Sequence, residues 1–303
     1  MANTKLIKTK IKSVNNLQKI VKALEIVSTI KLQKLKQKTL NFRAFMLQFL
    51  GVLQAIKEQV DIFDEHKLVQ HKEEGFGKRL IIVVTTDKGL CGSLNSKVTK
   101  HIQEKYGSIE EAKKNVDIFV IGKKGLDFFV GGGWNIVGTC HIKDSFDGSD
   151  LNNVFVYIRQ ALKDHRYAKI KIYFNYFKNV VTQIPLRFKL YPLDKESFDA
   201  FLENIDTKLD DIQAIVNNNL VLEPNPKRFA QNLIENIIHH IVYYAVLNNK
   251  TSEQASRMLA MKNAKDNCGE IVGGLQTIYN KTRQGKITQE ISEIVSAKIA
   301  IEN

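Results

Sequence analysis

The chain has 303 residues, of which 44% are hydrophobic and 25% are charged, and this composition excludes both a disordered and a fibrous protein. It carries 45 basic and 32 acidic residues, a formal net charge of +13. We therefore expect it to be attracted to an acidic partner, whether nucleic acid, an anionic membrane surface or a protein. No apolar run is long enough to cross a bilayer, which predicts a soluble or peripheral protein.

The first 60 residues are predicted to form one long coiled-coil helix, because Gly51 is the only glycine and no proline occurs from Thr4 to Gln59. Apolar residues recur every seventh position, with Ser28 as the exception, and a second row follows three residues later. The first row is Ile7, Val14, Val21, Ser28, Leu35, Phe42, Phe49 and Ile56, and the second contains Leu17, Leu24, Phe45 and Val52. The acid-poor start resembles a mitochondrial presequence, but the helical pattern continues for about fifty residues, so we expect mature protein.

Lysines occupy the other faces of this predicted helix, and Glu25 is the only acidic residue before Glu58. A run of like charges is most often a solvated face. The near absence of acids also removes the usual pairing between residues four apart. An acidic partner for Lys31, Lys34 and Lys38 is therefore an equally good interpretation, and both stay open at this point.

The middle of the chain is predicted to be an inserted α/β domain. Residues 61–77 are polar and glycine-flanked, which favours a linker, and residues 206–224 form a second connector. Between them, over residues 78–205, strands alternate with helices in a Rossmann-like pattern. Strands are expected at residues 80–86, 116–121, 169–176 and 182–190, and helices at about 95–106 and 151–164. Pro185 predicts an edge position for the last strand.

The last 79 residues, 225–303, are predicted to form a second and longer helix, which begins at Pro226 and would be on the order of 110 Å long. We expect it to pair antiparallel with residues 1–60, since a compact domain connects the two. Its expected contact row is Met261, Ala264, Cys268, Ile271, Leu275 and Ile278, followed by Ile287, Ile291, Ile294 and Ile301. The predicted fold is therefore α+β overall: a long antiparallel coiled coil with a small α/β domain inserted.

No catalytic, cofactor or metal site is predicted. The loop from Asp87 to Asn95 contains Gly89 and Gly92 after a strand, but it lacks the spacing of a phosphate-binding loop, so a tight turn is favoured. Cys91, Cys140 and Cys268 form no CxxC motif, which favours unligated thiols. Glu235 and His239 supply half of a metal site at most, and we expect His239 and His240 to lie along a partly buried face.

Four segments resemble the γ subunit family of F-type ATP synthases. They are residues 11–27 (IKSVNNLQKIVKALEIV), 86–95 (TDKGLCGSLN), 252–262 (SEQASRMLAMK) and 278–295 (IYNKTRQGKITQEISEIV). The resemblance covers both ends and the middle of the chain in the same order. It implies a rotor shaft without a catalytic site, turning inside an α3β3 ring, with the α/β domain on the membrane c-ring beside ε.

The resemblance also implies site residues. Arg283, Gln284 and Thr288 match residues that hold a β loop, and Lys22 and Leu24 of the N-terminal signature are expected to contact a β loop as well. Glu223 matches a position on the c-ring side. It implies no cofactor and a peripheral location on the cytoplasmic side of a bacterial membrane, or on the matrix or stromal side in an organelle. The alternative is a basic, coiled-coil, nucleic-acid-binding protein, and an enzyme built on residues 78–205 is a more distant one.

Overall fold

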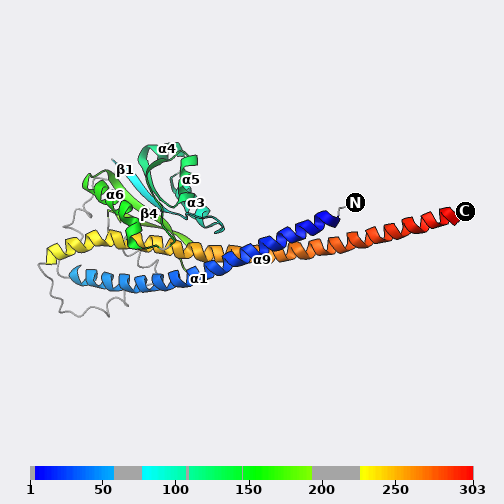
Figure 1. Cartoon of the computed structure of the whole chain (residues 1–303). Helices are drawn as coiled ribbons and strands as arrows, with labels where there is room; N and C mark the ends of the chain where they lie inside the picture. The colour runs from blue at the N-terminus through cyan, green and yellow to red at the C-terminus, as the bar shows by residue number, and fades with distance from the viewer. Residues whose placement is uncertain (1–3, 58–76, 107–108, 145, 193–225, 303) are drawn as a thin grey trace. The chain divides into compact units, whose positions relative to one another are not determined.

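The computed structural model describes residues 4–57, 77–106, 109–144, 146–192 and 226–302. The chain divides into two compact units, Lys31–Ser256 and Met1–Ile30 with Arg257–Asn303. The two terminal helices that the sequence predicts are confirmed, as α1 (Thr4–Lys57) and α9 (Pro226–Glu302) (Figure 1). The predicted connector and Glu223 lie outside the described residues, as does the linker apart from Gly77, so the predicted domain boundaries stay a prediction.

The unit Lys31–Ser256 contains a five-stranded sheet in the order β3-β2-β1-β4-β5. Strands β1 (Lys78–Val84), β2 (Val116–Ile121), β3 (Asn135–Cys140) and β4 (Tyr167–Phe177) are parallel, and β5 (Gln183–Tyr191) runs antiparallel to β4. The strands expected at residues 80–86, 116–121, 169–176 and 182–190 are therefore confirmed. Pro185 does lie in an edge strand.

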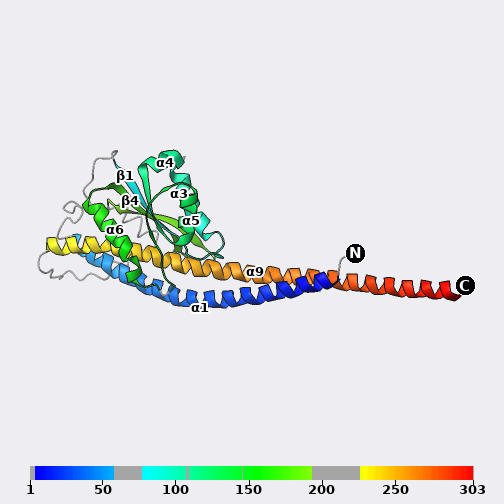
Figure 2. The ribbon, with the colours of Figure 1, turned by 45° about the horizontal axis from the view of Figure 1, so that its top comes forward.

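Helices cover both faces of this sheet. One face packs on α3 (Leu94–Tyr106), α4 (Ile109–Asn115) and α5 (Lys123–Gly131), through Ile102, Ala112 and Phe129. The other face packs on α6 (Asn152–Lys163), which follows the short 3-10 helix η1 (Gly148–Leu151), and on parts of α1 and α9 (Figures 1 and 2). The domain is thus a sheet between two helical layers, and α1 and α9 belong to one of those layers.

Within this unit, α1 and α9 pack against each other in antiparallel order. The hydroxyl oxygens of Thr39 and Thr251 lie 2.8 Å apart, and the rings of Phe42 and Tyr243 are 4.7 Å apart. His240 packs edge-on against Phe49, at 4.9 Å between ring centroids. Burial, and then the neighbouring His239, lower the pKa of His240. The partly buried face that the sequence predicts for this histidine pair is confirmed.

Four elements of the sheet domain were not predicted: α4, α5, β3 and the short 3-10 helix η1. Strand β3 carries Gly138, where a Cβ atom would lie 2.4 Å from the ring of Phe119, so the strand packs closely by lacking a side chain. Because β3 is an edge strand, most of its residues are only partly buried. Neither the alternation nor the apolar run of a typical strand is therefore present in its sequence.

Candidate functional site

The second compact unit, Met1–Ile30 with Arg257–Asn303, consists of the N-terminal half of α1 beside the C-terminal half of α9. Gln18 Nε2 donates to the carbonyl oxygen of Lys265, at 3.2 Å, and the Lys265 ammonium lies 3.0 Å from Glu25 Oε2. Glu25 raises the pKa of Lys265 through this hydrogen bond. Since residues 18 and 25 both meet the same turn of α9, polar side chains take part in this helix contact.

The buried rows of α1 differ from the predicted ones in their second member. Ile7, Val21 and Ser28 of the first row are buried as expected, but Leu17 and Phe45 are exposed. The second row follows four residues after the first rather than three, and it consists of Ile11, Gln18, Glu25, Leu32, Thr39 and Met46. Three of these six are polar, which is why an apolar pattern led to the wrong row.

In the α9 row, every seventh residue was predicted correctly, whereas the residues between them lie one position later than predicted. Met261 and Cys268 are buried, whereas Ile271 and Ile278 are each 52% exposed. Val272 and Tyr279 are partly buried in their place. The seven-residue repeat itself is kept, since Leu275 is also partly buried, but the second member follows four residues after the first rather than three, as in α1.

Lys22 and Leu24 occupy different surroundings in this helix pair. Lys22 is exposed and borders an open groove whose other wall includes Asp266 and Glu270 of α9. Leu24 is partly buried. Leu24 is therefore already used in part by the helix contact, while Lys22 remains accessible to another molecule.

Arg283, Gln284 and Thr288 lie on an exposed stretch of α9. All residues with described side chains from 283 to 301 are exposed, and α9 continues past the N-terminal end of α1 (Figure 2). The Thr288 hydroxyl donates to the carbonyl oxygen of Gln284, at 3.0 Å, so its acceptor lone pairs stay available. Gly285 adds no side chain here, and a Cβ atom built on it would meet nothing within 4 Å.

The structure does not bring the two predicted contact groups together. Lys22 lies opposite Asp266, and Arg283 follows Asp266 by 17 positions. At 1.5 Å per residue this separates the groups by about 25 Å along the helix. They are therefore two contact regions rather than one.

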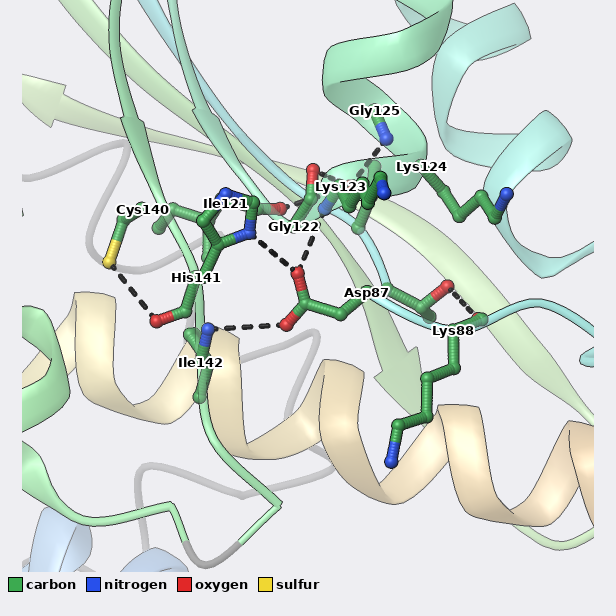
Figure 3. Close-up of polar contacts among 12 residues, drawn as sticks. Asp87, Lys88, Ile121, Gly122, Lys123, Lys124, Gly125, Cys140, His141 and Ile142 are labelled. Atoms are coloured by element: carbon green, nitrogen blue, oxygen red, sulfur yellow. Dashed lines mark hydrogen bonds and ion pairs between the residues drawn. The ribbon is translucent and has the colours of Figure 1, made fainter.

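Asp87 lies in the loop after β1, at the edge of the sheet where the parallel strands end. Its carboxylate accepts hydrogen bonds from the backbone N–H of Lys123 (2.9 Å) and of Ile142 (3.2 Å), and His141 Nδ1 lies 2.9 Å from Asp87 Oδ1 (Figure 3). Lys123 is the first residue of α5, where N–H groups need acceptors and an anion is favoured. The chain's own carboxylate thus occupies the place at this helix where a phosphate would bind.

The two residues before Asp87 complete the start of α5. Thr85 Oγ1 accepts from the Gly125 N–H, at 2.9 Å, and the Thr86 carbonyl accepts from the Lys124 N–H, also at 2.9 Å. Gly122, with φ of 101°, brings the chain so close that a Cβ atom would lie 2.4 Å from the Thr85 carbonyl oxygen. The segment after β1 is a structural joint, which agrees with the tight turn favoured from sequence.

We predict that Asp87→Ala lowers the free energy of unfolding by about 2–4 kcal/mol, because it removes a helix cap and leaves two N–H groups without this acceptor. Urea denaturation of the full chain measures the loss. Asp127→Ala is the matched control, since Asp127 also lies on α5 but makes only an exposed pair with Lys124, and it should change the value by less than about 0.5 kcal/mol. Equal stabilities of the two variants would contradict this role of Asp87.

Beyond the end of β1, side chains of α9 form hydrogen bonds with the backbone of β4 in place of a neighbouring strand. The last β1–β4 pair is Val83 with Tyr173, and beyond it β4 turns the N–H and C=O of Asn175 toward α9. Asn249 Oδ1 accepts from the Asn175 N–H (3.3 Å) and Nδ2 (2.9 Å), and Ser252 Oγ donates to the Asn175 carbonyl (3.2 Å). Asn248 Oδ1 accepts from the Phe177 N–H (3.4 Å). We call Asn248, Asn249 and Ser252 the side-chain ladder.

The ladder is fully enclosed and explains the position of Pro185. Asn175, Asn248, Asn249 and Ser252 are all at most 1% exposed. Pro185 lies opposite Asn175 in β5 and has no N–H to offer. The backbone N–H and C=O groups of Asn175 are bonded to α9, so the missing N–H of Pro185 does not leave the Asn175 carbonyl without a partner. Helix and sheet are thereby joined by directional bonds as well as by apolar packing.

The remaining candidates from the sequence are the three cysteines and the pair Glu235 and His239. Cys91, Cys140 and Cys268 are buried and form no disulfide, and burial, followed by Asp150 and Asp87, raises the pKa of the Cys140 thiol. The described residues contain no group of His, Cys, Asp and Glu able to hold a metal ion, and the Glu235 side chain lies outside what the structure describes. None of the helices described is both long enough and apolar enough to span a membrane.

Comparison with known proteins assigns the family. A family model described as ATP synthase matches residues 3–301. A relative named ATP synthase gamma chain from Histophilus somni (strain 129Pt) is 33% identical over 302 residues, covering 99% of this chain and 100% of the relative. A gamma chain from Legionella pneumophila (strain Corby) is 34% identical over 303 residues, with the same two shares. The chain belongs to the ATP synthase gamma chain family.

Solved structures of ATP synthases share the fold of this gamma chain family member. A chain of the Euglena gracilis mitochondrial ATP synthase, OSCP/F1/c-ring, in rotational state 3, aligns with a TM-score of 0.64 at 17% identity and covers 98% of this chain and 94% of its own length. A chain of the Tetrahymena thermophila mitochondrial ATP synthase, central stalk/c-ring, gives 0.58 at 22% identity, covering 81% and 99%. The predicted combination of a long helix pair and an inserted mixed α/β sheet is confirmed.

The family motifs have separate tasks in this gamma chain. The block from Thr86 to Asn95 forms the joint around Asp87, and Ser256 Oγ fastens it to α9 by donating to the Cys91 carbonyl, at 2.9 Å. Ser252 of the next motif belongs to the side-chain ladder. Sequence analysis missed Asn248 and Asn249, because two asparagines inside a helix signal low helix propensity rather than a contact. Their one visible signal was their position directly before the family motif.

Proposed function

We propose that this chain is the central rotor shaft of an F-type ATP synthase. It would couple ion flow through the membrane c-ring to conformational change at the catalytic β subunits, in ATP synthesis or hydrolysis. The observation that carries this proposal is the identity of 33–34% over essentially the whole chain to proteins named ATP synthase gamma chain. The alternative of a nucleic-acid-binding coiled coil has no support among these relatives.

The surface of the helix pair supports a shaft held by other subunits. Large apolar side chains remain 50% to 69% exposed on both helices of the Met1–Ile30 and Arg257–Asn303 unit. They include Leu6, Leu17, Ile20, Ile26, Ile30, Ile271, Ile278, Ile291 and Ile294. Exposed apolar surface on this scale favours a protein partner. The partners we propose are the α3β3 hexamer around the helix pair, and ε and the c-ring at the sheet domain.

In this assignment the chain performs no chemistry itself. We propose that it has no catalytic site and no cofactor, because the sequence contains no phosphate-binding loop and Asp87 already caps the start of α5. Arg283, Gln284, Thr288, Lys22 and Leu24 would contact a β loop, and Glu223 would lie on the c-ring side. The location we propose is peripheral, on the cytoplasmic face of the membrane or on the corresponding organellar side.

Single-molecule rotation tests this function directly. The chain is assembled with α3β3 subunits from the same source, the hexamer is fixed to a surface, and a bead is attached to the exposed face of α6 through a cysteine at Val156. We expect addition of Mg-ATP to drive stepwise rotation of the bead in one direction. ATP hydrolysis by the assembled complex with a stationary bead would contradict the rotor function.

A further inference from the structure

Within the Lys31–Ser256 unit, three lysines of α1 and α9 contact the same short connection between β3 and η1. We call this connection the strap and define it as His141, Ile142, Lys143, Asp144 and Phe146. Lys31 Nζ lies 2.9 Å from Asp144 Oδ2, Lys38 Nζ donates to the Phe146 carbonyl at 2.8 Å, and Lys250 Nζ donates to the Ile142 carbonyl at 3.0 Å. Lys31 and Lys38 come from α1, and Lys250 comes from α9.

The strap is bonded to the sheet as well. Asp87 accepts from the Ile142 N–H and contacts His141, and Lys88 Nζ lies 2.8 Å from Asp144 Oδ2. One carboxylate oxygen therefore joins a lysine of α1 to a lysine of the loop after β1. Lys88, followed by Lys31, holds the pKa of Asp144 well below its usual range. The two ammonium groups converge on this one charge, so its removal leaves like charges facing each other.

The strap is also anchored by its apolar side chains. Ile142 and Phe146 are each 5% exposed and belong to the core between sheet and helices. The Phe146 ring stacks on Tyr243 of α9 at 5.0 Å, and Lys38 Nζ lies 5.2 Å from the centre of the Phe146 ring. Apolar contacts of this kind resist separation, but they are not directional. The bonds of Asp144 and of the Ile142 and Phe146 carbonyls are directional, so they fix where the strap lies on the two helices.

We propose that Asp144 is a positioning residue that keeps the sheet domain from shifting along α1 when the chain carries torque. This inference rests on the proposed rotor function. It also gives Lys31 and Lys38 a task inside the chain, so the acidic partner considered for the lysine face of α1 is not needed for these two. Under load, a shift of the sheet along α1 would have to break the Lys31–Asp144 bridge and the bond from Lys38 to the Phe146 carbonyl together. The bond from Lys250 to the Ile142 carbonyl holds the same strap to α9.

The test uses Asp144→Asn, which keeps the side-chain size but removes the charge, with Asp144→Glu as the conservative variant. Asp164→Asn is the matched control, since Asp164 pairs with Arg166 at 3.3 Å in a similarly exposed place without contacting α1 or α9. In the complex reconstituted into vesicles, ATP-driven proton pumping is followed until it stalls. We expect Asp144→Asn to lower the proton gradient at stall at least twofold, Asp144→Glu to restore it, and Asp164→Asn to leave it unchanged.

A second measurement uses the full chain without partners, so it stands apart from the rotor function. Spin labels at the exposed positions Lys34 and Val156 report the distance between α1 and the sheet domain. We expect Asp144→Asn to broaden the distance distribution while the melting temperature stays within about 2 °C. An unchanged distribution and an unchanged stall gradient would overturn the role of Asp144. If the parental chain never drives pumping, the rotor function fails, and the label distances still decide whether Asp144 positions the sheet.

Discussion

Replacing Asn249 by alanine is expected to destabilise the Lys31–Ser256 unit by about 3 kcal/mol. The side chain accepts two hydrogen bonds from Asn175, and both residues are at most 1% exposed. Alanine would leave a backbone N–H and a side-chain amide buried without this acceptor, and each such group costs about 1–3 kcal/mol. No water from the surface replaces the lost oxygen at full burial without opening the contact between helix and sheet.

Urea denaturation of the full chain, followed by circular dichroism and by tyrosine fluorescence, measures this effect. Asn153→Ala is the control, because Asn153 lies exposed on α6 and its replacement should change stability by about 0.5 kcal/mol or less. The expected result is a clearly lower midpoint for Asn249→Ala at a similar slope. Coinciding curves for the two variants would mean that apolar packing alone joins α9 to the sheet.

The double variant Arg283→Ala with Gln284→Ala is expected to fold normally but to cut rotation-coupled ATP turnover about tenfold. Both residues lie on the exposed stretch of α9, and alanine is at least as good a helix former. In the assembled complex, we propose, they donate hydrogen bonds to a β loop. A tenfold rate effect corresponds to about 1.4 kcal/mol. The neutral bond contributes about 1 kcal/mol net and the charged bond more, so losing both supplies at least this amount.

Turnover is measured in the reconstituted complex, in both the synthesis and the hydrolysis direction. Gln289→Ala serves as the control, since Gln289 is exposed on the same stretch and bonds to Glu293 of its own helix at 2.9 Å. Circular dichroism confirms that the variants keep their helix content. If the assembled double variant made and hydrolysed ATP at the parental rate, the assignment of these residues as β-loop contacts would be wrong.

The sequence predicted the elements that follow a strong period and missed those that do not. Strand β2 was predicted with its observed ends, because all six of its residues are buried and all except Asp117 are apolar. Strand β3 was missed, since Gly138 and its partly buried neighbours follow neither period. In α1 the first row was found and the second was not, because Gln18, Glu25 and Thr39 occupy positions where an apolar residue was sought.

The candidate contacts divide along a similar line. Residues in family motifs, such as Arg283 and Lys22, were found because the resemblance names them. Asn249 was not found, since its partner Asn175 lies 74 residues away in the sequence. Asp144 was not found either, since Lys31 and Lys88 lie 113 and 56 residues away from it. A single sequence carries no sign of such pairings. Only the folded arrangement shows that a polar residue in a helix completes the edge of a strand.

The polar residues in the α1 seam have one further consequence, for longitudinal alignment of the two helices. A purely apolar heptad seam permits neighbouring alignments that differ by seven residues, because each presents a similar apolar surface. Here a displacement by one heptad would place Met258 or Val272 where Lys265 now meets Glu25. The Glu25 side chain is only 19% exposed, so its charge would lose its counterion in a largely dry setting. Glu25 and Lys265 thus select a single alignment, as a polar residue in a coiled-coil core commonly does, at some cost in stability.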